Sequence, residues 1–106
     1  MSAISRAQRN KAEDFLNQAD KTLKKSTWFA SSTEQKYEDA AELFERAANA
    51  YKVGSLFAEA GKAYKDAAAI HQKNLKNMGE ASKCLTNSGK SFFFKEFEWK
   101  LYTAFF

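Results

Sequence analysis

The sequence lacks proline altogether and has only four glycines, one cysteine and one histidine among its 106 residues. With so few turn-forming residues, the chain cannot easily supply the many tight turns of a β-sandwich or barrel. A single cysteine excludes a disulfide within the chain and favours a reducing, intracellular setting. No apolar run approaches the ~18–20 residues of a membrane-spanning helix, and the first residues lack the apolar stretch of a secretory signal.

The residues that are abundant favour helix. Alanine, lysine, glutamate and glutamine are frequent, and all of them have high helix propensity. The formal net charge is +4, which permits an acidic partner but does not indicate nucleic acid. We therefore expect one all-α domain that binds no nucleic acid.

The first third of the chain predicts a helix followed by a loop. Apolar residues recur at helical spacing from about Ile4 to Lys25. The polar run that follows, over residues 26–36, contains two large aromatics, Trp28 and Phe29. Serine and threonine favour loops and helix caps, so the sequence predicts that Ser32 or Thr33 caps the next helix.

The rest of the chain repeats itself three times, with offsets of 20 and 21 residues. Each unit opens with a large apolar residue, followed by an acid and then by two small residues. The units open at Tyr37, Phe57 and Met78. A second pair of small residues follows in each unit, at Ala47-Ala48, Ala67-Ala68 and Ser88-Gly89.

Small residues at this spacing let neighbouring helices approach to the short end of ~8–10 Å. A helix with two such faces cannot bury both of them alone, so successive helices stack as a solenoid. The links over 53–56 and 74–77 are short, which makes sequential helices antiparallel. The prediction is a tetratricopeptide-like α-solenoid over residues 1–93, with about four helices of which the first is the longest.

Three stretches of this repeat resemble the N-terminal repeats of soluble NSF attachment proteins of the α/β type. They are Lys36-Tyr37-Glu38-Asp39-Ala40-Ala41, Arg46-Ala47-Ala48-Asn49-Ala50-Tyr51-Lys52 and Ala60-Gly61-Lys62-Ala63-Tyr64. The aromatic loop before the second helix also has its counterpart in the family. The resemblance extends from Ala12 to Phe92.

The resemblance implies an adaptor and not an enzyme. Members of the family bind the four-helix bundle of assembled SNARE proteins and recruit the NSF ATPase, which disassembles it during vesicle-mediated protein transport. The implied location is cytoplasmic and peripheral on endomembranes. The family's C-terminal helices, which contact the ATPase, have no counterpart here, so we expect the chain not to stimulate the ATPase. The alternative is a generic helical-repeat scaffold that binds a peptide in its groove.

Two sets of site residues follow from the resemblance. Trp28 and Phe29 are the expected membrane contact, although they can equally fold back and cap the solenoid. The expected SNARE-binding residues are Lys52, Lys62, Lys65 and Lys90. An acidic partner would be steered towards lysines in a salt-dependent way, whereas the alternative for each lysine is an ordinary solvated side chain.

Neither a cofactor nor a metal is predicted. His71 and Cys84 are too few soft ligands for a metal site. The segment Asn87-Ser88-Gly89-Lys90-Ser91 is similar to a phosphate-binding loop, but that pattern requires glycine where the chain has Cys84.

The last residues, 94–106, are predicted to be an aromatic-rich tail unrelated to the repeat. Phe93 and Phe94 stand where the family usually has a basic pair, and Phe97, Trp99 and Leu101 alternate as in a strand. An interfacial anchor or an unstructured end covering the open edge of the solenoid are the other interpretations. A solenoid end without a polar cap predicts low solubility or self-association.

Overall fold

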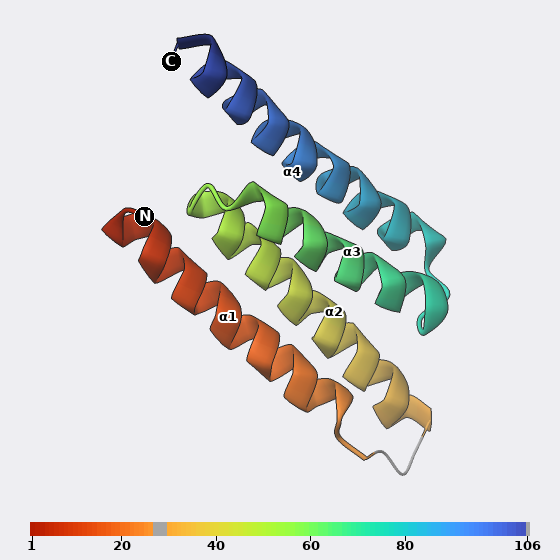
Figure 1. The fold of residues 1–106 in the computed structure, drawn as a ribbon. Helices are drawn as coiled ribbons and strands as arrows, with labels where there is room; N and C mark the ends of the chain where they lie inside the picture. Colours follow the sequence, from red (N-terminus) through yellow and green to blue (C-terminus); the bar gives the residue numbers. More distant parts are fainter. Residues whose placement is uncertain (27–29, 106) are drawn as a thin grey trace.

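The structure, a computed structural model, is a row of four antiparallel helices in chain order (Figure 1). They are α1 (Ala3–Leu23), α2 (Ala30–Val53), α3 (Phe57–Lys73) and α4 (Met78–Phe105). The backbone is described for residues 1–26 and 30–105, and the side chains for all of these except 30–32, 102 and 105. Each helix packs mainly against its neighbours in the chain, over overall extents of 57 × 28 × 14 Å. This arrangement confirms the predicted all-α solenoid.

The ends of the helices follow local capping rules. Ser2 accepts a hydrogen bond from the backbone N–H of Ser5 at 3.0 Å and so caps α1. Asn77 accepts one from the N–H of Glu80 at 3.1 Å at the start of α4. The links over 54–56 and 74–77 are as short as predicted, and each contains a non-glycine residue with positive φ, Ser55 and Lys76.

Two predictions about the helices are wrong. Helix α2 begins at Ala30, so Ser32 and Thr33 lie inside it and do not cap it from outside. Propagating a helix adds one backbone hydrogen bond per residue, which outweighs the weak preference of serine and threonine for loops. The longest helix is α4, with 28 residues, and not α1, with 21.

The core is lined by the small residues of the repeat. Eight of them from α2, α3 and α4 are at most 2% exposed: Ala40, Ala41, Ala47, Ala48, Ala60, Ala67, Ala68 and Ala81. Bulky side chains fill the spaces between them, among them Phe44, Tyr51 and Tyr64, all less than 10% exposed. The repeat therefore provides the close packing that its spacing predicted.

Helices α3 and α4 lie close together at Gly61. A Cβ atom at this position would lie 2.7 Å from the ring of Phe92. The Gly61 carbonyl also accepts a hydrogen bond of 2.8 Å from the buried hydroxyl of Ser88. Glycine at this position therefore makes room for an aromatic ring from the next helix.

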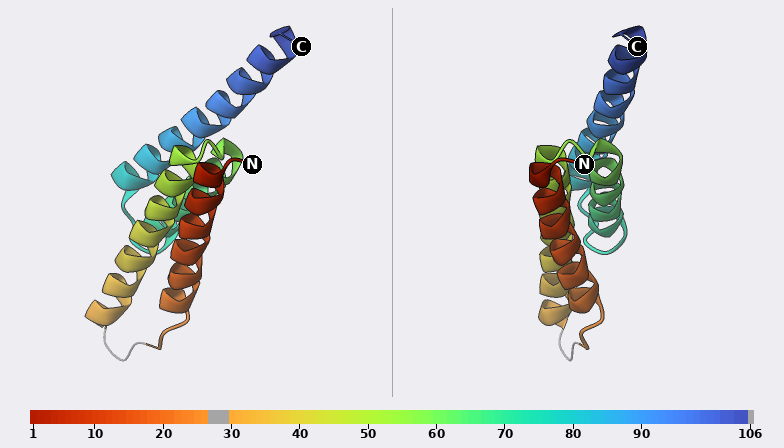
Figure 2. Two further views of the ribbon diagram at one scale, coloured as in Figure 1. Left: turned by 90° about the vertical axis from the view of Figure 1, so that its left-hand side faces the viewer. Right: turned by 60° about the vertical axis from the view of Figure 1, so that its left-hand side comes forward.

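The aromatic end of the chain is helical as far as Phe105, which corrects both the strand and the unstructured interpretations. No glycine or proline interrupts it, and the rings of Phe93 and Phe97 stack with centroids 6.3 Å apart. The ring centroid of Phe94 lies 5.8 Å from that of Phe57, the first residue of α3. Residues after Phe94 therefore extend past the start of α3 and away from the row, and do not fold back over its edge (Figure 2). The domain boundary at residue 93 stays a prediction.

None of the helices in the described part of the chain is both long enough and apolar enough to cross a bilayer.

Candidate functional site

The row of helices carries a cleft on one of its faces. Its volume is about 300 Å³, and it lies where α1 and α3 flank α2. The lining residues are Leu16, Asp20, Phe44, Tyr51, Glu59, Lys62, Ala63 and Asp66. Leu16, Phe44 and Tyr51 supply its apolar surface, and the charged residues come from α1 and α3.

The charges in this cleft are mainly negative. Partial burial raises the pKa of Asp66, and the charge of Asp20 raises it further, while Lys62 opposes both effects. Glu59 adds another carboxylate to the same lining. The predicted SNARE-binding residue Lys62 therefore lies among acids, which makes the cleft a poor surface for an acidic partner.

Lys52 lies on the opposite face. Its ammonium nitrogen is 5.7 Å from the centroid of the Tyr64 ring, a cation–π distance, and the Tyr64 hydroxyl donates a hydrogen bond to Asn49. On α3, Tyr64 and His71 are about two turns apart and therefore share a face. Lys62 and His71 are two and a half turns apart, so Lys62 points away from the face that carries His71 and Tyr64. Lys52 and Lys62 are therefore on opposite faces of the row.

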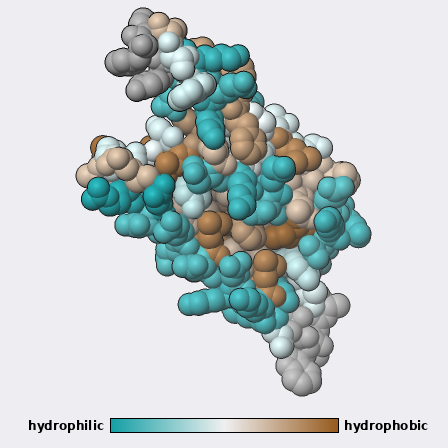
Figure 3. Space-filling model, in the orientation of Figure 1, coloured by the Kyte–Doolittle hydropathy of each residue, from teal (hydrophilic) through white to brown (hydrophobic). Residues whose placement is uncertain are grey.

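The two other predicted lysines are exposed. Lys65 lies on α3, three residues after Lys62, and Lys90 lies on α4 between the buried residues Ser88 and Ser91. The structure therefore does not gather the four predicted lysines into one patch. Figure 3 shows a face on which hydrophilic side chains predominate and hydrophobic surface appears in narrow gaps between them.

The predicted membrane contact, Trp28 and Phe29, lies outside the described residues. On either side of it, the end of α1 and the start of α2 lie at the far end of the molecule from the C-terminal end of α4 (Figure 1). The Lys36 ammonium donates a hydrogen bond of 2.9 Å to the backbone carbonyl of Lys25 and lies 5.4 Å from the Tyr37 ring centroid. Lys36 is therefore engaged within the protein, whereas Lys24 and Lys25 are exposed.

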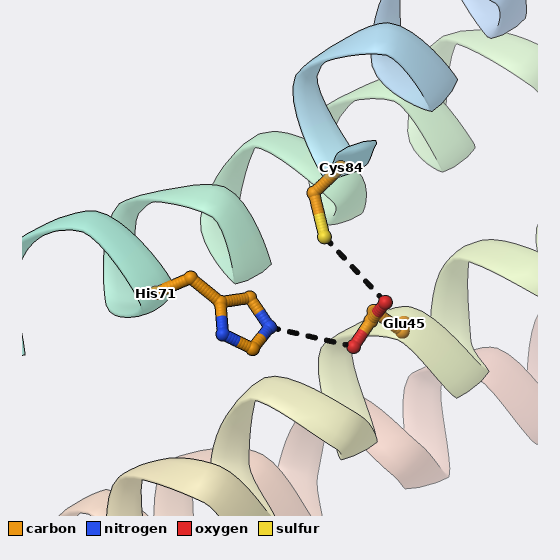
Figure 4. A group of neighbouring side chains, drawn as sticks. All are labelled: Glu45, His71 and Cys84. Atoms are coloured by element: carbon orange, nitrogen blue, oxygen red, sulfur yellow. Dashed lines mark hydrogen bonds and ion pairs between the residues drawn. The ribbon is translucent and has the colours of Figure 1, made fainter. Parts of the chain in front are cut away.

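One polar cluster was missed by the sequence reasoning. Glu45 of α2, His71 of α3 and Cys84 of α4 point towards one another between the helices (Figure 4). The Cys84 sulfur lies 3.5 Å from a Glu45 carboxylate oxygen. Burial, and then the charge of Glu45, raise the pKa of the thiol to about 12. The sequence contains one signal of this cluster, because the imidazole of His71 stands where the other repeat units have the aromatic residues Tyr51 and Phe92.

Comparison with known proteins identifies the family. A family model described as soluble NSF attachment protein, SNAP, matches residues 10–99. No curated protein and no solved structure matches the chain. The matched stretch includes most of the chain and all three repeat units with their buried alanines. The chain belongs to the soluble NSF attachment protein family.

Proposed function

We propose that this chain is an adaptor, and not an enzyme, that binds the four-helix bundle of assembled SNARE proteins on endomembranes and links it to the NSF ATPase in vesicle-mediated transport. The family match over residues 10–99 carries this proposal. The row of tightly packed helices supports it, because stacked helices form an extended surface of the kind that binds elongated partners.

The face that carries Lys52 is the better surface for an acidic bundle. Lys52 is exposed beside Tyr64, whereas the opposite cleft holds Asp20, Glu59 and Asp66. Attraction between a basic surface and an acidic partner speeds association and weakens with salt. We therefore rank Lys52 first among the four lysines and Lys62 last, with Lys65 and Lys90 as peripheral contributors.

The membrane contact remains part of the proposal. Trp28 and Phe29 would insert at the interfacial region, where aromatic side chains are favoured, and the exposed Lys24 and Lys25 would interact with anionic headgroups at about 1 kcal/mol each. Membrane and SNARE contacts would then come from different parts of the chain, so that both can form at once.

Capture of a preassembled SNARE bundle by the full chain tests the SNARE contact. We expect saturable binding that weakens with salt, and about tenfold weaker binding for Lys52→Glu, which corresponds to about 1.4 kcal/mol. Lys21→Glu makes the same charge change on an exposed position of α1 and is expected to bind as the wild type does. Equal losses in both variants would indicate non-specific attraction, and binding of single peptides but not of the bundle would favour the generic scaffold.

Flotation with anionic liposomes tests the membrane contact separately. The double substitution Trp28→Ser, Phe29→Ser is expected to reduce flotation while leaving SNARE capture unchanged. Unchanged flotation would refute the assignment of these two residues.

A further inference from the structure

The cluster of Glu45, His71 and Cys84 has no role in the proposed adaptor function. One potential ligand atom from each residue lies within 4.8 Å of the others. Two of the separations are 3.5 Å from the Cys84 sulfur to Glu45 Oε1 and 3.6 Å from His71 Nε2 to Glu45 Oε2. Because each residue comes from a different helix, the solenoid packing itself brings the three groups together.

The ring nitrogens of His71 are the second observation that points to a metal ligand. His71 is only 9% exposed, and both of its ring nitrogens are buried without a hydrogen-bond partner. Buried polar atoms are nearly always paired in proteins, and leaving one unpaired costs about 1–3 kcal/mol. Figure 4 shows Nε2 directed towards the Glu45 carboxylate, at a distance too long for a hydrogen bond. An imidazole nitrogen in this position is available as a metal ligand.

We propose that Glu45, His71 and Cys84 bind a zinc ion between α2, α3 and α4. Zinc prefers tetrahedral sites of thiolate, imidazole and carboxylate groups, with bonds of about 2.3 Å to sulfur and about 2.0–2.2 Å to nitrogen and oxygen. Tetrahedral angles at these lengths place sulfur and oxygen about 3.5 Å apart, and nitrogen and oxygen about 3.3 Å apart. The observed 3.5 and 3.6 Å are close to these values, but they end on different oxygens of Glu45, and the three ligand atoms as a set lie within 4.8 Å of one another. The side chains therefore have to draw slightly closer together when the ion binds.

The surroundings fit a zinc ion better than a hard cation. Magnesium and calcium prefer sites built from oxygen ligands, whereas two of the three groups here are a thiol and an imidazole. The Glu45 side chain is 31% exposed, so the ion can enter from solvent and a water molecule can occupy the fourth position. On binding, the cation takes the place of the Cys84 thiol proton, which passes to solvent.

A simple hydrogen-bonded cluster is the competing explanation. In that arrangement the Cys84 thiol donates to Glu45 and a protonated His71 pairs with the same carboxylate. It accounts for the two contacts to Glu45 but leaves His71 Nδ1 buried and unpartnered. The two explanations differ in whether a metal binds, and that can be measured directly.

Titration of the untagged full chain with Co²⁺, followed by displacement with Zn²⁺, tests the proposal. The chain has one histidine and one cysteine, so a thiolate-to-cobalt charge-transfer band reports on Cys84 alone. We expect binding of one Co²⁺ per chain with this band, and loss of the band as Zn²⁺ is added. Zn²⁺, but not Mg²⁺, is also expected to raise the melting temperature, because a ligand that binds only the folded state stabilises it.

Substitutions by residue types that the other repeat units have at the same positions separate loss of metal binding from misfolding. Cys84→Ala and His71→Phe install the residue types that other units have at these positions, at Ala63 and Phe92. Because loss of a supporting partner alone costs about 10–100-fold in metal affinity, we expect each variant and Glu45→Gln to bind at least about 100-fold more weakly. Glu42→Gln, an exposed neighbour on α2, is the matched control and should bind as the wild type does.

The proposal fails if no charge-transfer band appears with folded wild-type chain, as judged by circular dichroism. It also fails if Cys84→Ala and His71→Phe retain wild-type affinity, which would identify surface binding elsewhere. None of these measurements involves SNARE proteins, so they stand apart from the proposed function.

Discussion

The helices in the middle of the row and the last helix, α4, carry the same repeat pattern but differ in burial. Ala48, Ala68 and Gly89 occupy the same position in the three repeat units. Ala48 and Ala68 are 0% and 2% exposed because the next helix packs over them, whereas a Cβ added at Gly89 would meet no atom within 4 Å. The repeat therefore encodes the capacity for close packing, and the presence of a following helix decides whether that capacity is used.

The aromatic residues of the two regions differ in the same way. Phe44 and Tyr64 in the middle of the row are 8% and 3% exposed, while Phe93 and Phe97 on α4 are 64% and 51% exposed. Ring contacts along α4 reduce this exposure only in part. The aromatic residues of the middle fill the spaces between the small ones, and those of α4 remain available for a contact outside the row.

The largest expected effect is a difference in stability when leucine is introduced at equivalent positions of the two regions. Ala48→Leu forces a large side chain between packed helices and is expected to cost about 3 kcal/mol of unfolding free energy. Gly89→Leu places the same side chain in open space and should not destabilise the protein. Urea denaturation of both variants measures the difference. Equal losses would show that α4 is covered in solution as the middle of the row is.

The second effect concerns self-association. Exposed apolar surface of this kind commonly marks an interaction site, and α4 carries several exposed large apolar side chains. We expect the wild type to self-associate at high concentration and Phe93→Ser, Phe97→Ser to shift it towards monomer, as measured by light scattering. Lys100→Ser changes an exposed residue of the same helix and is the control. A wild type that stays monomeric at high concentration would contradict the prediction.

The third effect compares two glycines in helices. Gly89→Ala is expected to stabilise the protein by about 0.8 kcal/mol, because alanine is the better helix former and nothing obstructs its methyl group. Gly61→Ala should give no such gain, since its methyl group would collide with the ring of Phe92. Thermal unfolding of the two variants checks this. A similar gain at both sites would mean that Phe92 moves aside freely.

Most of the fold could be predicted from the sequence, because the repeat fixes both the helices and their packing. The short links and the buried alanines followed directly from the spacing of small residues. The end of α4 could not be predicted in the same way. Its alternating aromatics, Phe97, Trp99 and Leu101, match a strand over a short window, but continuing an existing helix needs no new nucleation, and no partner strand is present among the described residues.

The polar cluster was harder to predict than the fold. The sequence marks His71 and Cys84 as potential metal ligands, but Glu45 lies 26 residues before His71 and no local spacing connects it to them. Only the register of three helices brings these groups within contact. The split of Lys52 and Lys62 onto opposite faces has the same origin, because the face of a lysine depends on how its helix is rotated against its neighbours.

The smallest expected effect concerns Asp66 in the cleft. Partial burial raises the pKa of its carboxyl in the folded state above the ordinary value of 3.8, so the folded state binds the proton more tightly than the unfolded state does. Stability therefore falls as the pH rises through the interval between the two pKa values, and the charged Asp66 remains unfavourable above it.

Asp66→Asn removes this unfavourable charge, so the variant should be more stable than the wild type at neutral pH. The gain should be below about 0.5 kcal/mol, because solvent still reaches the side chain. It should disappear below pH 3.8, where Asp66 is protonated in both states. Melting temperatures across the acidic range measure the effect, with Glu38→Gln, an exposed position on α2, as the control. A gain that persists unchanged into acid would mean that the amide stabilises the cleft by its own contacts and not through the loss of charge.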